Sequence, residues 1–235
     1  MSKPLQQPQR ERQFKHRLPL ALRYLDKKGF RLLVSGRTLS GKTTQAVSIL
    51  KKMKPLCKWD YVYLVCPTDG QETYDPILTW ITKTYREADA TEEDQDVFSR
   101  LIKKVEKHHR DHAKTLIIVD DCAGKHATNT GRKGGLPQLA ANSRHMGLTL
   151  VIITQNLTSV TKTMRDNSEG IMLFSSMSAD EKDIMIKERN PFGDKVTLKE
   201  FYEESVSQPF GFLFQLNTTR GVLHFDGLDR FLGSS

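Results

Sequence analysis

The sequence contains few cysteines and no long uninterrupted hydrophobic segment. Its three cysteines, Cys57, Cys66 and Cys122, are odd in number and lack the spacing of a zinc site, so we expect no disulfide framework and no structural metal centre. They are the reduced thiols expected of an intracellular protein. No apolar run approaches the length of a membrane span, and the polar N-terminal residues lack the apolar core of a secretory signal. We therefore expect neither a membrane span nor secretion.

The charge of the chain is not evenly distributed. The 235 residues carry a net charge of +8, and residues 1–31 hold nine Lys or Arg against only two acids, a net of +7. We predict a basic, partly disordered N-terminal arm at residues 1–30, followed by one domain at residues 31–235 in which residues 176–235 form an extension. Such an arm attracts polyphosphate backbones through counterion release; a solvated tail is the alternative.

Strand and helix signals alternate along the domain, which is typical of βαβ units. Short runs rich in Val, Ile, Leu, Tyr or Phe predict buried strands at residues 32–35, 61–66, 115–119, 148–154 and 171–174. Helical patterns occupy residues 43–51, part of 75–85, a segment from about residue 91 to 105, 179–189 and 197–205. Residues 210–216 and 220–225 predict a hairpin. The expected fold is α/β, with a mainly parallel five-stranded sheet, helices on both faces and a C-terminal β-hairpin extension.

A phosphate-binding motif lies between the first predicted strand and the first predicted helix. Its glycines allow backbone amides to turn toward phosphate oxygens, and the helix N-terminus adds a positive dipole. Lys42 would reach the β- and γ-phosphates, and the Thr43 hydroxyl would ligate Mg²⁺. We expect a nucleoside triphosphate to contact the residues Gly36, Arg37, Thr38, Leu39, Ser40, Gly41, Lys42, Thr43 and Thr44.

Two acids end the predicted strand 115–119. Opposite a phosphate loop, Asp120 would hold the shell of the magnesium ion through water, and Asp121 could accept a proton from the attacking water as a general base. An ordinary strand-ending turn is the alternative for this pair.

Gln155 follows the predicted strand 148–154. Ligands of open α/β sheets bind beyond the carboxyl ends of strands, so Gln155 could contact the γ-phosphate or the attacking water. A polar turn is again the alternative. The sequence lacks the Asn/Thr-Lys-x-Asp motif with which GTPases read guanine, and ATP is therefore favoured over GTP.

These motifs together resemble the FtsK–HerA superfamily of DNA-pumping ATPases. The similarity rests on the phosphate loop, on Ile-Ile-Val-Asp-Asp at residues 117–121, and on Leu-Ala-Ala-Asn-Ser-Arg-His-Met-Gly-Leu at residues 139–148 leading to Thr-Gln-Asn at residues 154–156. Lys-Thr-Met-Arg-Asp-Asn-Ser at residues 162–168 extends it. Within the superfamily, residues 30–190 resemble the genome-packaging ATPases of poxvirus-like large DNA viruses, virophages and related mobile elements.

The resemblance implies a RecA-like P-loop NTPase core in which the strand before Gln155 lies between the phosphate-loop strand and the Asp120 strand. It also implies a homo-oligomeric ring, a pentamer or a hexamer, with ATP at the subunit boundaries and an arginine entering from the neighbouring subunit. Such an arginine stabilises charge on the transferred phosphoryl group. Arg144 is the expected arginine and Arg165 its substitute.

A glycine-rich basic segment at residues 124–135 follows the acidic pair. In a ring it could line the channel, where Lys125, Arg132 and Lys133 would contact DNA phosphates without reading the bases. A solvated surface loop is the alternative.

The leading expectation is an ATP-driven translocase that moves double-stranded DNA, without sequence preference, into a preformed capsid. Its cofactors would be ATP and Mg²⁺, its partners DNA and capsid vertex proteins, and its location the virion or the virus factory of the host cell. The alternatives are a nucleotide-switched DNA- or capsid-binding assembly factor without sustained turnover, and a conjugation-type DNA-pumping ATPase.

Overall fold

The computed structural model describes residues 17–67, 72–86, 97–121, 135–143, 145–175, 177–189 and 195–234. These residues form one nine-stranded sheet in the order β3-β2-β4-β5-β1-β6-β7-β8-β9. The strands from β3 to β6 in this order are parallel, and β7, β8 and β9 extend the sheet in antiparallel fashion. The strand bounds are β1 Arg31–Ser35, β2 Tyr61–Cys66, β3 Lys83–Arg86, β4 Thr115–Asp120, β5 Thr149–Thr154, β6 Gly170–Phe174, β7 Phe212–Thr218, β8 Gly221–Asp226 and β9 Arg230–Ser234.

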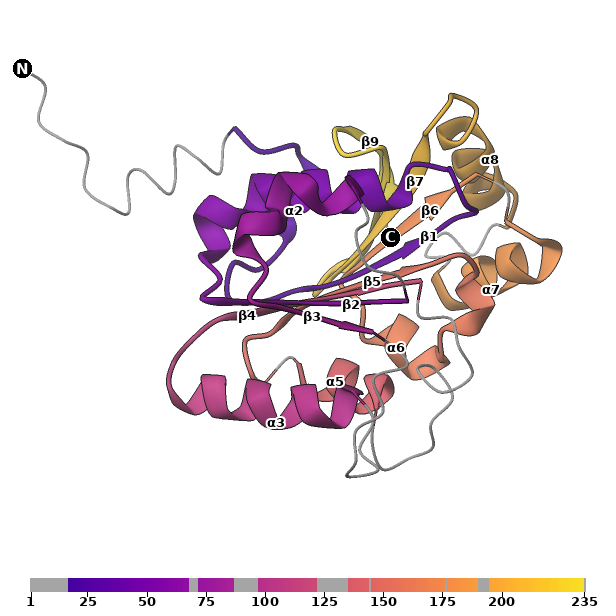
Figure 1. Ribbon diagram of the computed structural model, residues 1–235. Helices are drawn as coiled ribbons and strands as arrows, with labels where there is room; N and C mark the ends of the chain where they lie inside the picture. The colour runs from indigo at the N-terminus through magenta and orange to yellow at the C-terminus, as the bar shows by residue number, and fades with distance from the viewer. Residues whose placement is uncertain are drawn as a thin grey trace, which may run out of the picture.

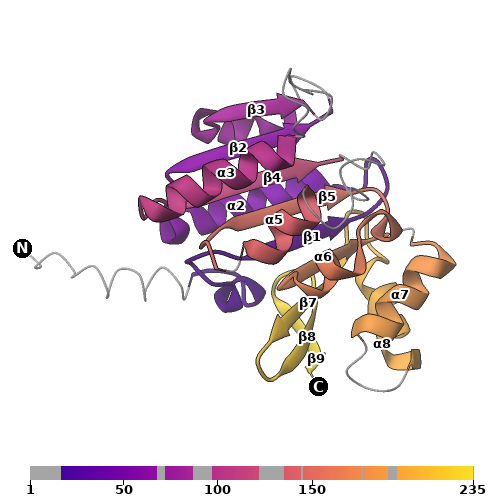
Figure 2. The same cartoon turned by 90° about the horizontal axis from the view of Figure 1, so that it is seen from below.

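Helices cover both faces of the sheet. Helix α2 lies on one face, and α3, α5 and α6 lie on the other (Figures 1 and 2). The α-helices are α2 Lys42–Cys57, α3 Val97–Arg110, α5 Leu136–Asn142, α6 Lys162–Asp166, α7 Ala179–Arg189 and α8 Lys195–Ser205; the 3₁₀ helices are η1 Ala21–Tyr24, η2 Glu72–Trp80 and η3 Leu157–Ser159. None of the helices in the described ranges is long and apolar enough to cross a bilayer.

The sheet divides the core into two layers. Strand β1 illustrates the division, because Leu32 and Val34 pack with α2 while Leu33 faces the opposite layer with α3 and α5. All five residues of β1 are buried, as are all six of β4 and of β5. A parallel strand covered on both faces needs apolar residues at successive positions, which is why these strands read as continuous hydrophobic runs. The packing places their carboxyl ends at one edge of the sheet, around the phosphate loop.

The fold class and the five predicted parallel strands are confirmed, each strand to within one residue. Two further strands were not predicted. Strand β3 has the sequence Lys-Thr-Tyr-Arg and buries only Tyr85, so no hydrophobic run marks it. The prediction that residues 75–85 are partly helical is confirmed, since η2 extends to Trp80. Strand β9 buries none of its residues, and it pairs only with β8. Both strands lie at an edge of the sheet, where one-sided pairing suffices and a strand needs little apolar sequence.

The segment before β1 is part of the domain. Leu18, Ala21, Leu22 and Leu25 are buried in the core layer that contains α2. The backbone amide of Ala21 donates to the carbonyl of Leu228 at 2.9 Å, which ties η1 to the turn after β8. An apolar segment of leucine and alanine side chains thus packs on the core from residue 18, inside the range predicted as the basic arm. Residues 1–16 lie outside the described ranges.

Two of the three cysteines lie within the described ranges. Cys57 and Cys66 are free and buried, and burial raises the pKa of the Cys57 thiol to about 12. A raised pKa keeps the Cys57 thiol protonated, and a buried protonated thiol is unreactive. Cys122 lies outside the described ranges.

Candidate functional site

The loop at residues 36–41 joins β1 to α2, as the motif predicts. The backbone amide of Gly36 donates to the carbonyl of Thr154 at 3.2 Å, which fixes the start of the loop to β5. A Cβ on Gly36 would lie 2.6 Å from the Cβ of Phe174, so no side chain fits there. Leu39 and Gly41 have positive φ values of 64° and 88°. This left-handed backbone lets successive amides face one side, next to the unpaired amides of the first turn of α2. The loop has the geometry of an anion site.

Two side chains of the loop point inward. Lys42 is buried, and its Nζ donates to the carbonyl of Arg37 at 3.5 Å across the loop. The Ser40 Oγ is buried and has no hydrogen-bond partner among the described residues. In contrast Arg37, Thr38 and Leu39 are exposed. A buried ammonium and a buried hydroxyl beside a row of amides form a donor set that suits phosphate oxygens.

Asp120, at the end of β4, faces the first turn of α2. Its carboxylate is only 3% exposed; the Tyr74 hydroxyl donates to Oδ2 at 2.7 Å, and the Thr43 hydroxyl lies 3.5 Å from the same atom. Burial raises the pKa of Asp120 above its ordinary value, while the bond from Tyr74 and the charge of Lys42 act in the opposite direction. One carboxylate and one hydroxyl fit Mg²⁺, which binds few protein oxygens and completes its shell with substrate phosphates and water.

Tyr74 was not predicted as a site residue. It lies on η2 and reaches Asp120 across 46 residues of sequence. Tyr74 belongs to no recognisable sequence motif. Its contact with Asp120 follows only from the packing of η2 against α2, which the sequence does not indicate. By donating to Oδ2, Tyr74 fixes the orientation of the carboxylate, as outer-sphere partners of metal ligands commonly do.

Asp121 and Gln155 form a direct pair at the ends of β4 and β5. The Gln155 Nε2 donates to Asp121 Oδ2 at 2.5 Å. The backbone of Asp121 has a φ of 51°, and its amide donates to the carbonyl of Ile153 at 3.0 Å. The Asp121 Oδ1 is buried without a hydrogen-bond partner in the described part of the chain, and can accept a proton or a hydrogen bond. The order β4-β5-β1 also agrees with the implied position of the Gln155 strand.

Arg165 does not have the placement of an arginine that enters a neighbouring site. Its guanidinium is buried, and Nε and Nη2 donate to the two carboxylate oxygens of Glu188 at 2.8 Å and 2.7 Å. Nη1 donates to the carbonyl of Val160. All three nitrogens are thus engaged within their own chain, so the structure favours a structural role that joins α6 to α7, in place of the substitute role expected from the resemblance.

The remaining predicted site residues lie outside the described ranges. These are Arg144, the expected trans-acting arginine, and the three basic residues expected to contact DNA, Lys125, Arg132 and Lys133. Their roles stay predictions from sequence.

The fold is shared with several solved structures. The genome packaging NTPase B204 from Sulfolobus turreted icosahedral virus 2 is similar in its complex with AMPPCP, with 16% identity, a TM-score of 0.60, and coverage of 84% of this chain and 97% of that one. The complex of the same NTPase with ATP-gammaS has 14% identity and a TM-score of 0.59, and the match covers 84% of this chain and 96% of that one. EssC (ATPases 2 and 3) from Geobacillus thermodenitrificans has 12% identity and a TM-score of 0.56, and the match covers 86% of this chain and 39% of that one. At these identities the likeness establishes the fold.

Sequence comparison identifies the family. No match was found among curated proteins. The model of the Poxvirus A32 protein family, however, matches residues 19–203, which include the phosphate loop, Asp120, Asp121 and Gln155. The resemblance noted from the motifs is thereby confirmed, and the chain belongs to the Poxvirus A32 protein family.

Proposed function

We propose that this protein is an ATPase that drives double-stranded DNA into a preformed viral capsid. The observation that carries the proposal is the convergence of Lys42, Thr43, Asp120, Asp121 and Gln155 at one edge of the sheet, contributed by three adjacent strand ends. A site that only binds nucleotide needs the phosphate loop; the additional carboxylate–amide pair is what hydrolysis requires.

The chain's own groups have distinct parts in the reaction. Lys42 and the amides of the loop hold the β- and γ-phosphates of ATP. Gln155 orients a water molecule, and Asp121 takes its proton as the water oxygen bonds to the γ-phosphorus and the bond from that phosphorus to the ADP oxygen breaks. Mg²⁺ held near Thr43 and Asp120 would neutralise charge on the phosphate oxygens. The products are ADP, inorganic phosphate and a proton.

DNA packaging is supported by family membership and by the fold shared with a genome packaging NTPase. In the proposed assembly the chain forms a ring of five or six subunits at a capsid vertex, in the virion or the virus factory. Arg144 of each subunit would complete the site of its neighbour, and Lys125, Arg132 and Lys133 would contact the DNA backbone. The net charge of +8 favours such contacts.

The decisive experiment is ATP turnover with and without duplex DNA. We expect DNA to raise the rate at least several-fold, and Lys42→Ala to abolish turnover. Lys107→Ala is the control, because Lys107 lies exposed on α3, on the other face of the sheet from α2 (Figure 1), and it should leave the rate unchanged. Tight ATP binding with negligible turnover on any DNA would overturn the proposal and favour the nucleotide-switched assembly factor.

The shared site is tested by mixing subunits. Arg144→Ala and Asp121→Asn should each be inactive alone, and equal mixtures should recover activity because some boundaries then combine an intact Asp121 with an intact Arg144. The mass of the assembly with ATP and DNA should equal five or six subunits. A protein that stays monomeric, or mixtures without recovery, would contradict the shared site.

A further inference from the structure

An exposed aromatic residue lies against the phosphate loop. Phe210, in the turn between α8 and β7, is 64% exposed. The side chain nevertheless packs against Gly41. A Cβ placed on Gly41 would lie 3.0 Å from Cδ1 of the Phe210 ring, and Cβ and Cγ of Phe210 are the next nearest atoms. The base of the Phe210 side chain therefore lies against Gly41, the last residue before α2, and most of the side chain remains open to solvent.

The backbone of Phe210 is held in a conformation that a phenylalanine rarely adopts. Its φ is 62°, and the amide of Gly211 donates to the carbonyl of Gln208 at 3.0 Å, closing a turn with Pro209 and Phe210 at its centre. Proline followed by a residue with positive φ is the pattern of a type II turn, in which glycine is the preferred third residue. A Cβ on Gly211 would lie 2.3 Å from the carbonyl oxygen of Ser205, so the chain has little room to relax. Non-glycine residues in this region of φ gather at functional sites.

Phe210 lies on the opposite side of the loop from the groups that act on the terminal phosphate. Asp121 and Gln155 directly follow β4 and β5, which lie on one side of β1 in the sheet; β6 and β7 lie on the other side. Phe212 pairs with Phe174 at the carboxyl end of β6, and their ring centroids are 5.0 Å apart. The phosphate loop thus has a polar, acidic side and an aromatic side.

We infer that Phe210 is the surface on which the nucleotide base of ATP stacks. The inference rests on the proposed hydrolysis, which requires the γ-phosphate to face Asp121. The phosphate chain then crosses the loop, and the nucleoside leaves it on the side of β6 and β7. An exposed ring at that point offers a flat apolar surface, and stacking on such a surface is how proteins commonly hold bases without reading their edges.

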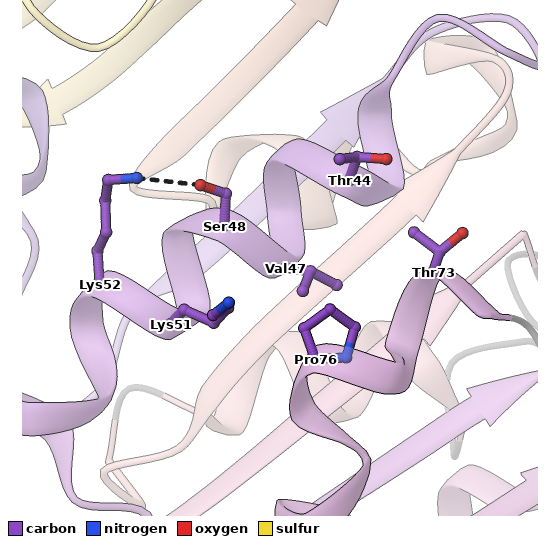
Figure 3. Close-up of a pocket in the computed structure, with 7 residues that line it drawn as sticks. All are labelled: Thr44, Val47, Ser48, Lys51, Lys52, Thr73 and Pro76. Carbon is purple, nitrogen blue, oxygen red and sulfur yellow. Dashed lines mark hydrogen bonds between the residues drawn. The ribbon is translucent and has the colours of Figure 1, made fainter.

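A second route for the nucleoside is the groove between α2 and η2. This groove has a volume of about 400 Å³ and is lined by Thr44, Val47, Ser48, Lys51, Lys52, Thr73 and Pro76 (Figure 3). It contains no aromatic ring, and the Lys52 ammonium already donates to the Ser48 hydroxyl at 3.0 Å. It also lies next to Tyr74, whose hydroxyl binds Asp120, and so on the side assigned to the magnesium and the terminal phosphate. Both observations favour Phe210.

The test compares MgATP with magnesium tripolyphosphate, which has the phosphates but no base. We expect Phe210→Gly to weaken MgATP binding roughly tenfold while leaving tripolyphosphate binding unchanged. Glycine accepts the positive φ, so thermal stability should not fall. Phe210→Trp should keep the affinity for MgATP. Phe231→Ala is the matched control, since Phe231 is also an exposed phenylalanine, at 49%, and lies on β9.

The possible failures are distinguishable. If Phe210→Gly binds MgATP as tightly as the wild type, the inference is overturned, and Ser48→Trp shows whether the base occupies the groove beside α2. If Phe210→Gly weakens MgATP and tripolyphosphate equally, Phe210 supports the loop and not the base, which also overturns the inference. If the wild-type protein binds neither compound, the failure is that of the proposed function.

Discussion

The two sides of the phosphate loop differ in how they are built. On one side Asp120, Asp121 and Gln155 come from the ends of two strands and carry charge or hydrogen-bonding groups. On the other side Phe174 and Phe210 come from β6 and from the turn before β7, and their side chains lie against Gly36 and Gly41 of the loop. The difference indicates a division of labour in which the acidic side acts on the terminal phosphate and the aromatic side holds the nucleoside.

We expect the largest loss of ATP turnover from a substitution of Asp121, on the acidic side of the loop. Asp121→Asn keeps the size of the side chain and its bond with Gln155 but removes the proton acceptor. We expect turnover to fall by about 10² to 10⁴, with ATP affinity unchanged, as measured by single-turnover hydrolysis and equilibrium binding. Asp180→Asn, an exposed carboxylate in the first turn of α7, is the control. Loss of ATP binding in Asp121→Asn would break the division of labour.

A second prediction concerns the structural pair that joins α6, the helix before β6, to α7. Arg165→Leu leaves the mostly buried Glu188 without its partner and should lower the free energy of unfolding by about 3–5 kcal/mol. Adding Glu188→Leu should restore part of this loss. Denaturant unfolding measures both. An Arg165→Leu variant of normal stability whose activity is recovered only in mixed rings would return Arg165 to the role expected from the resemblance.

Gln155 should affect turnover less than Asp121. Gln155→Ala removes the donor that lies 2.5 Å from Asp121 Oδ2, and we expect hydrolysis at saturating ATP to slow about 100-fold. Phe210→Gly should leave the hydrolysis rate at saturating ATP near the wild-type value and raise only the ATP concentration that gives half of this rate. A lower hydrolysis rate at saturating ATP in Phe210→Gly would show that the aromatic side also acts on the terminal phosphate.

We expect the smallest effect, a pH-dependent loss of stability, from His224 in the antiparallel strands next to the aromatic side. Burial, assisted by the charge of Arg189, lowers the pKa of His224 on β8 to about 4. The unfolded chain then binds more protons than the folded one between about pH 6.5 and pH 4, so the stabilising contribution is complete above this window and is lost as the pH falls through it. We expect a loss of about 2 kcal/mol at pH 5. Urea unfolding of wild type and His224→Gln across this range measures it; equal pH profiles would contradict the assignment.

The acidic side of the site was predictable from sequence because each of its parts is local. Glycine spacing, a lysine and a threonine at a strand–helix junction, and polar residues after hydrophobic strands all read directly from neighbouring residues. Strands β1, β2, β4, β5 and β6 were predictable for the same reason, since burial on both faces demands a continuous apolar run.

The parts that were not predicted depend on contacts between distant segments. Tyr74 meets Asp120, and Phe210 meets Gly41, only after η2 and the turn before β7 have packed around α2. Neither residue stands in a pattern that sets it apart from core aromatics, and the sequence predicts Phe210 as the first residue of a strand. Strand β3 escaped prediction because an edge strand with one buried side chain has no hydrophobic period.

We expect the terminal phosphate and the magnesium ion to lie between the first turn of α2 and the end of β4. A crystal structure with Mn²⁺ and AMPPCP tests it most directly, because the anomalous signal of manganese locates the metal independently of the nucleotide. We expect an anomalous peak between Thr43 Oγ1 and the Asp120 carboxylate, with the γ-phosphate facing Asp121. A peak at another place, with nucleotide density away from residues 36–43, would contradict it.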